Sequence, residues 1–170
     1  MLYDDNLTQE EQFDLFSELI AFYRWYPDAF LESITPYDED GNRQGITLGS
    51  DQKYILRIIA RYPYSHMVIS RGYGKTLLEI LSLFVSAILT PDLTISMSAQ
   101  TLQSSANLIL EKISEIKKFY PIIADEIVTE QISRDRVYIE FKSGAKITNL
   151  ENRQSAKGKR RNLVKNSHFI

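Results

Sequence analysis

The stretch HMVISRGYGKTLLEIL, from His66 to Leu81, decides the interpretation of the whole chain. Its apolar residues Met67 to Ile69 include two β-branched side chains, which predicts a short strand. The residues after Lys75 are apolar on most of a helical surface, which predicts a helix packed against a sheet. A strand, a loop ending in Gly-Lys-Thr and a helix form the context of a phosphate-binding loop, although Ile69 stands where G-x-x-x-x-G-K-[ST] begins with glycine.

The loop SRGYGK has the chemistry that binding of a nucleotide phosphate requires. Backbone N–H groups from Gly72 to Thr76 would converge on a phosphate at the positive end of the helix. Lys75 would reach the β- and γ-phosphate oxygens, and the Thr76 hydroxyl would hold Mg²⁺. Gly72 and Gly74 would let the backbone approach the phosphates closely. The alternative is a glycine-rich turn with a chance Gly-Lys-Thr, and the predicted strand and helix favour an ATP and magnesium site.

Composition indicates a globular chain of the ordinary kind. Its 170 residues are 44% hydrophobic and 25% charged, and the absence of cysteine excludes disulfides and thiolate metal sites. A net charge of −2 argues against a nucleic-acid-coated domain but leaves room for a basic patch. Residues 1–11 do not resemble a signal peptide, and the apolar stretch around Leu77 to Leu89 is too short to span a membrane. We therefore expect a cytoplasmic protein with no membrane partner.

Periodicity predicts the remaining elements. Thr8 and Glu11 form a capping-box pattern at the start of an amphipathic helix, which restarts after Pro27. Further helices are expected at Ser50 to Arg61 and Thr101 to Tyr120, a buried strand at Leu93 to Ser98, and a β-hairpin in VYIEFKSGAKITNL. This order predicts an α/β fold of the P-loop NTPase type, a three-layer sandwich with a mainly parallel central sheet. We expect an N-terminal helical segment over 1–49 and an ATPase core over 50–170, truncated at its C-terminal end.

The loop SRGYGKT resembles the deviant Walker A loop of the large terminase subunit of tailed bacteriophages, the ATPase that drives DNA into proheads. In that family the first glycine is commonly absent, and a small residue followed by arginine precedes Gly-Lys-Thr or Gly-Lys-Ser, so Ile69 fits. The similarity covers most of the chain from Phe22 onward. It includes FYRWYPDAFLESI, GITLGSDQKYIL, LTISMSAQTLQSSANLILEKI and VYIEFKSGAKITNLE, and SAKGKRRN stands where the family has an Ala-Arg-Gly-x-Arg run.

The resemblance implies roles for individual residues. Arg71 matches the arginine of the family's loop and would stabilise charge on the leaving γ-phosphate, the alternative being a salt bridge to a neighbouring loop. Gln52 matches the glutamine that reads adenine, the alternative being a surface glutamine on a helix. The implied catalytic residues are Arg71 and Lys75, and Thr76 is the implied magnesium ligand. The implied ATP-binding residues are Gln52, Ser70, Arg71, Gly72, Tyr73, Gly74, Lys75 and Thr76.

The resemblance also implies partners. In the family the ATPase acts on double-stranded DNA together with a small terminase subunit and the portal, and forms a homo-oligomeric ring on the prohead. A basic cluster near the C-terminus could contact DNA or a neighbouring subunit's nucleotide, and a solvated tail is the alternative. Its members are Arg153, Lys157, Lys159, Arg160 and Arg161.

The match fails at the Walker B strand, which should end in Asp-Glu because hydrolysis needs both carboxylates. That strand would fall at LVKNSHFI, where Ser167 and His168 stand at the carboxylate positions. Asp125 and Glu126 follow three apolar residues, but an exposed turn is the better interpretation because they come directly after a helix. No counterpart of the family's nuclease domain follows in the sequence.

These observations predict a terminase-type module that binds ATP and hydrolyses it poorly. The alternative is a non-catalytic nucleotide-binding remnant or interaction protein derived from a prophage terminase. A third hypothesis is another P-loop motor of the helicase kind.

Overall fold

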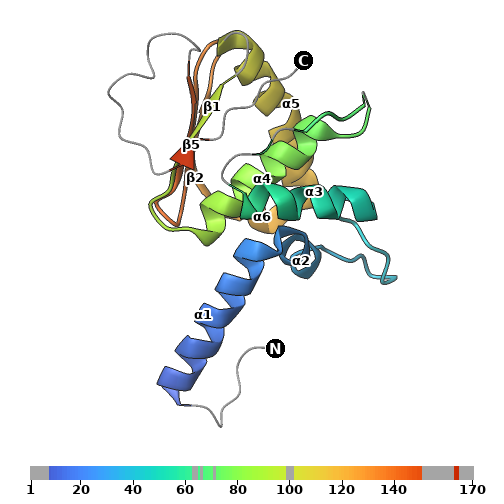
Figure 1. Cartoon of the computed structure of the whole chain (residues 1–170), viewed down its shortest axis with the longest axis vertical. Helices are drawn as coiled ribbons and strands as arrows, with labels where there is room; N and C mark the ends of the chain where they lie inside the picture. Colours follow the sequence, from blue (N-terminus) through green and yellow to red (C-terminus); the bar gives the residue numbers. More distant parts are fainter. Residues whose placement is uncertain are drawn as a thin grey trace.

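The computed structural model describes residues 8–62, 65, 67–70, 72–98, 102–150 and 163–164. Figure 1 shows a small sheet with helices gathered on one side of it and one long helix projecting from the body. The helices are α1 (Gln9–Trp25), α2 (Pro27–Ser33), α3 (Ser50–Arg61), α4 (Lys75–Leu89), α5 (Leu102–Phe119) and α6 (Pro121–Asp125). The strands are β1 (Thr94–Ser98), β2 (Ile127–Ile132), β3 (Val137–Phe141), β4 (Lys146–Leu150) and β5 (Leu163–Val164).

The sheet is mixed, with the order β2-β3-β4-β1-β5. Strands β2, β3 and β4 pair antiparallel, whereas β1 pairs in parallel with β4 on one side and with the two-residue β5 on the other. The expected α/β class is confirmed, but the expected mainly parallel sheet is not. The reason is that the hairpin and the edge strand β2 contribute as much pairing as the parallel strands do.

The two faces of the sheet differ in polarity, which explains why the expected three-layer sandwich is not confirmed. Ile95, Met97, Ile139 and Ile147 are buried on one face, under α4 and α5, which contact both β1 and β4. The other face carries Glu140, whose carboxylate accepts a hydrogen bond from the Tyr138 hydroxyl at 2.9 Å and pairs with Lys146 at 3.4 Å. A sheet between two helical layers needs apolar side chains on both faces, and the described side chains on the second face are mostly polar.

The strand expected at Met67 to Ile69 is wrong. Residues 67–70 have no regular secondary structure, and the Val68 side chain is 91% exposed. Three apolar residues cannot specify a strand without a partner to complete its hydrogen bonds. In the sheet, β1 pairs with β4 on one edge and, through Ile95 and Ser96, with β5 on the other.

Most of the other expected elements are confirmed. The Thr8 hydroxyl accepts from the Glu11 N–H, and the Glu11 carboxylate accepts from the Thr8 N–H at 2.8 Å, so the expected capping box starts α1. The helix at Ser50–Arg61, the helix after Lys75, the strand after Leu93 and the β3–β4 hairpin also form. The sequence reading missed α6 and β2, which join α5 to the hairpin.

The core forms around α4, whose residues Leu78, Leu81 and Phe84 are buried. The Phe84 ring meets the Phe141 ring of β3 edge-on, with centroids 5.5 Å apart, and so joins the helix to the sheet. Leu31 of α2 belongs to the same buried cluster. The proposed boundary between residues 49 and 50 stays a prediction, although the core continues across it. Among the described residues, no helix has the length and apolarity that crossing a membrane would demand.

Helix α1 stands out because none of its residues is buried. Ile20 and Tyr23, near its C-terminal end, pack against the core. The N-terminal part projects away from the body (Figure 1), and there the Phe13 side chain is 68% exposed. Most of the apolar face of this helix is therefore uncovered by the described residues.

Candidate functional site

The start of α4 is shaped by two glycines in the left-handed conformation. Gly72 has a φ of 81° and Gly74 a φ of 87°, values that cost L residues about 1–2 kcal/mol. Gly74 is the N-cap of α4, and its carbonyl accepts the Leu78 N–H at 3.0 Å to close the first helical turn. The glycines therefore let the chain enter the helix sharply, with Lys75 as its first residue.

The N-terminus of α4 is open to an anion. No described side chain caps it, and its first turn carries no acidic residue. The N–H groups of Lys75, Thr76 and Leu77 lack intrahelical acceptors, as in every α-helix. Lys75 and Thr76, the first two residues of the helix, are both half-buried. Positive charge and unpaired donors gathered at a helix start are what phosphate groups bind.

Gln52 connects this loop to the start of α3. Its side-chain amide nitrogen donates to the Tyr73 carbonyl at 2.9 Å, and its amide oxygen accepts from the Gly49 N–H at 2.9 Å. Gln52 is the third residue of α3, where a glutamine commonly satisfies the N–H of the N-cap residue. The structure brings Gln52 to the glycine loop through contacts with backbone groups, and the adenine-reading role implied by the resemblance stays a prediction.

Tyr73 makes a second link between the loop and α3. Partial burial raises the pKa of the Tyr73 phenol, and the neighbouring Asp51 carboxylate raises it further by its charge and by a hydrogen bond. Sequence reasoning missed Asp51 as a neighbour of the loop. The spacing Gly49-x-x-Gln52 was the available signal that the start of α3 is capped and fixed in orientation.

The remaining predicted residues divide into two groups. Ser70 and Gly72 are described and exposed. The hydrogen bond from Gln52 to the Tyr73 carbonyl brings Gln52 together with the loop residues from 72 to 76. Arg71 lies outside the described residues, and so do the C-terminal residues Arg153, Lys157, Lys159, Arg160, Arg161, Ser167 and His168.

Carboxylates do not gather beside the loop in the part of the chain that the structure describes. No group of three or more Asp, Glu or His side chains there could hold a metal ion. Glu126 lies in the expected turn and pairs with Lys142 at 3.7 Å, whereas Asp125 is the exposed last residue of helix α6. Strand β5 occurs where the Walker B strand was expected and runs parallel to β1, but residues 165–170 lie outside the description.

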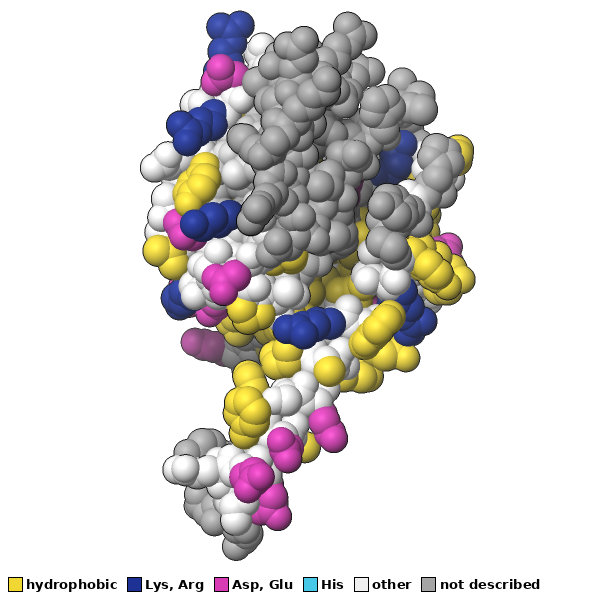
Figure 2. All heavy atoms as spheres, turned by 60° about the vertical axis from the view of Figure 1, so that its left-hand side comes forward, with side chains coloured by type: hydrophobic (Ala, Val, Ile, Leu, Met, Phe, Trp, Pro, Cys, Tyr) yellow, Lys and Arg dark blue, Asp and Glu magenta, His cyan; other side chains and the backbone are white. Residues whose placement is uncertain are grey.

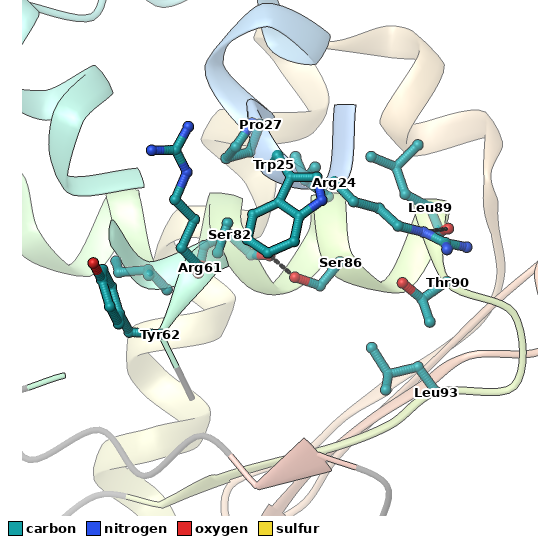
Figure 3. A pocket seen from close by; sticks show the side chains of 13 residues that line it. Arg24, Trp25, Pro27, Arg61, Tyr62, Ser82, Ser86, Leu89, Thr90 and Leu93 are labelled. Atoms are coloured by element: carbon teal, nitrogen blue, oxygen red, sulfur yellow. Dashed lines mark hydrogen bonds between the residues drawn. The ribbon is translucent and has the colours of Figure 1, made fainter. Parts of the chain in front are cut away.

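A cavity of about 550 Å³ lies at the opposite end of α4 from Lys75. Figure 3 shows Trp25 above α4, with Tyr62 and Leu93 on either side of the opening. The Arg24 side chain closes one edge by donating from Nε to the Leu89 carbonyl at 2.8 Å. Neither Lys75 nor Thr76 lines this cavity, so it is separate from the glycine loop.

Comparison with known proteins adds no assignment. The sequence matches no family model, and no curated protein is significantly similar to it.

Proposed function

We propose that this chain binds ATP with magnesium through the loop from Ser70 to Thr76, as a module of the terminase ATPase type. One observation carries the proposal: α4 begins at Lys75, after two left-handed glycines, with an uncapped N-terminus. Two glycines in that conformation and a helix start free of side-chain caps leave room for phosphate oxygens beside the first N–H groups.

The described residues fit the phosphates of ATP. The N–H groups of Lys75, Thr76 and Leu77 would bind phosphate oxygens, and the Lys75 ammonium would neutralise the β- and γ-phosphates. The Thr76 hydroxyl would hold the magnesium ion, whose other ligands would be phosphate oxygens and water. The resemblance adds Arg71 at the γ-phosphate. Magnesium would supply charge neutralisation on the phosphates.

The proposal includes weak hydrolysis. Attack of water on the γ-phosphate needs a carboxylate to orient that water and another to support the metal. Among the described residues no cluster of three or more Asp, Glu or His side chains could hold a metal ion, and LVKNSHFI has no carboxylate. We therefore expect this chain to bind ATP and to turn it over slowly, if at all.

The test is equilibrium binding of a fluorescent ATP analogue with magnesium, followed by phosphate release from the same samples. Lys75→Ala should weaken binding about tenfold or more, because it removes a charge-assisted contact. Lys118→Ala is the matched control, since Lys118 is an exposed lysine at the far end of α5. Equal affinity of native protein and Lys75→Ala would overturn the nucleotide site. Sustained turnover that depends on Lys75 would overturn the weak-hydrolysis part.

The partners implied by the resemblance belong to the same proposal: double-stranded DNA, a small terminase subunit, the portal and a homo-oligomeric ring. The DNA part rests on the basic residues Lys157 to Arg161. It predicts duplex binding that weakens as salt rises and that ignores sequence. If removal of Lys157 to Arg161 left binding at low salt unchanged, the DNA part would be wrong.

A second candidate, the interaction protein, is favoured by the uncovered face of α1. Phe13 and Phe16 are each more than half exposed, on a helix whose other side carries Glu10, Glu11, Asp14 and Glu18. Figure 2 shows the acidic side chains gathered on the projecting end of this helix. An apolar face flanked by acidic residues suits a partner helix that is apolar with basic flanks.

This second candidate is tested with an amphipathic helical peptide of leucine and lysine. The native chain should bind it more weakly as salt rises, and Phe13→Ser combined with Phe16→Ser should abolish the binding. Ala21→Ser, an exposed change on the acidic side of α1, should have no effect. Binding that survives the double substitution would exclude α1 as the docking helix.

A further inference from the structure

Gln52 uses both ends of its side-chain amide on the backbone. The oxygen accepts the N–H of Gly49, the N-cap of α3, and the nitrogen donates to the carbonyl of Tyr73 in the glycine loop. Both contacts are 2.9 Å long, which is the ordinary length of a good N–H···O bond. A surface glutamine would have solvent at one end at least, so this side chain bridges two segments 21 residues apart.

The bridge lies directly beside the N-cap of α4. Tyr73 is followed directly by Gly74, whose carbonyl closes the first turn of α4. A Cβ built on Gly74 would lie 3.3 Å from the Gln52 amide nitrogen, closer than most such contacts. The amide therefore packs against the N-cap as well as bonding to the residue before it. A change in the position of the Gln52 amide would therefore change the direction in which the first N–H groups of α4 point.

We propose that Gln52 is a positioning residue, which holds the glycine loop so that the α4 N-terminus presents its N–H groups to a phosphate chain. This inference rests on the proposed nucleotide site and adds a property to it: affinity for the phosphates alone depends on Gln52, with no base present. The amide retains one N–H and one oxygen lone pair beyond the two bonds made here, so contact with a base can be added without breaking the bridge.

Inorganic tripolyphosphate is the probe that separates positioning from base reading. It competes for the phosphate site and has no adenine, so a glutamine that only reads adenine would not affect it. Gln52→Met keeps the length and volume of the side chain. It should weaken the binding of tripolyphosphate and of ATP by a similar factor, about five- to tenfold. Gln103→Ala, an exposed glutamine change on α5, is the control and should alter neither.

The outcomes distinguish this inference from the proposed function. If Lys75→Ala weakens the binding of both ligands while Gln52→Met weakens only ATP binding, the proposed nucleotide site is supported and the positioning role is wrong. If Lys75→Ala changes neither, the nucleotide site itself is wrong. In that case amide hydrogen exchange in the free protein still tests whether Gln52 holds the loop. The amides to measure are those of the first hydrogen-bonded turn of α4, from Leu78 onward.

Gln52→Glu sharpens the exchange measurement. Its carboxylate can still accept from the Gly49 N–H and suits the positive end of α3, but it cannot donate to the Tyr73 carbonyl at neutral pH. We expect faster exchange at the start of α4 in this variant, with the melting temperature close to native. Unchanged exchange in both Gln52→Glu and Gln52→Met would overturn the bridge.

Discussion

The guanidinium of Arg57 on α3 binds the carboxylate of Asp28 on α2 at both oxygens, at 2.9 Å from Nε and 2.6 Å from an Nη atom. The Asp28 residue is only 3% exposed, and the same guanidinium lies 5.0 Å from the centre of the Tyr26 ring. The hydrogen bond to Asp28 raises the pKa of Arg57 above its usual value. This pair fixes the N-terminal helices to α3, the helix that carries Gln52.

Asp28→Asn should therefore destabilise the protein by about 1–3 kcal/mol, because it removes the charge from a nearly buried, doubly bonded acceptor. Chemical unfolding at neutral pH measures the change. Asp14→Asn, at an exposed position on α1, is the matched control and should shift stability by less than about 0.5 kcal/mol. A loss as small for Asp28→Asn would mean that the pair contributes nothing to holding α2 on α3.

The pH dependence of stability should contain a contribution from Glu32. A hydrogen bond from Arg43, and then one from Lys53, hold the pKa of Glu32 below its ordinary value of 4.5. A lowered folded-state pKa stabilises the protein above about pH 4.5, and that stability is lost as the pH falls through the folded-state pKa. Because Glu32 is partly solvated, we expect about 0.5–1 kcal/mol. Glu32→Gln should lose this amount at pH 7 and differ little from native near pH 3; an equal difference at both pH values would exclude the ionic contribution.

Substitutions at Gly74 and Gly41 can be compared to separate the effect of backbone strain from the effect of damaging the nucleotide site. Both have positive φ, 87° and 79°, but a Cβ at Gly41 meets nothing within 4 Å, whereas at Gly74 it meets Gln52. Gly41→Ala and Gly74→Ala should each cost about 1–2 kcal/mol of stability. Only Gly74→Ala should also weaken binding of the ATP analogue. Equal effects of the two changes on binding would show that the loop conformation is unimportant.

Phe84→Ala tests the contact that joins α4 to the sheet. Phe84 is fully buried and meets Phe141 edge-on, so its truncation should cost about 3–5 kcal/mol through lost burial and an unfilled cavity. Phe13→Ala removes the same side chain from an exposed position on α1 and should cost little. Thermal unfolding of the two variants compares them directly, and a mild effect at Phe84 would mean that the core can collapse around the gap.

Periodicity in the sequence was sufficient to predict an element where one helix or hairpin stabilises itself or shows a clear apolar face. The capping box at Thr8, the helix at Ser50–Arg61 and the alternation of Val137, Ile139 and Phe141 are local patterns, and the structure follows them. The same alternation, read further, also indicates a sheet with one polar face, because Tyr138 and Glu140 occupy the other side. That pattern already argued against a sheet covered on both faces.

The errors arose where pairing partners decide the structure. Met67 to Ile69 looked like a strand, but strand formation depends on a neighbour with free edge groups, which three residues cannot reveal. β2 was missed because its residues Thr129, Glu130 and Gln131 give no apolar alternation at an exposed sheet edge. The site could be predicted as a loop from its glycines and Lys75, but its bridge to α3 depends on tertiary packing, which brings Gln52 against Tyr73.

The cavity at the far end of α4 has an optical consequence. Trp25, on its rim and 53% exposed, is the single tryptophan of the chain. Its intrinsic fluorescence therefore reports on one known position, where α1 meets α4. A molecule that fills the cavity would remove water from the indole and shift its emission to shorter wavelength, while nucleotide binding at Lys75, at the other end of the same helix, would leave the spectrum unchanged unless the helix itself moves.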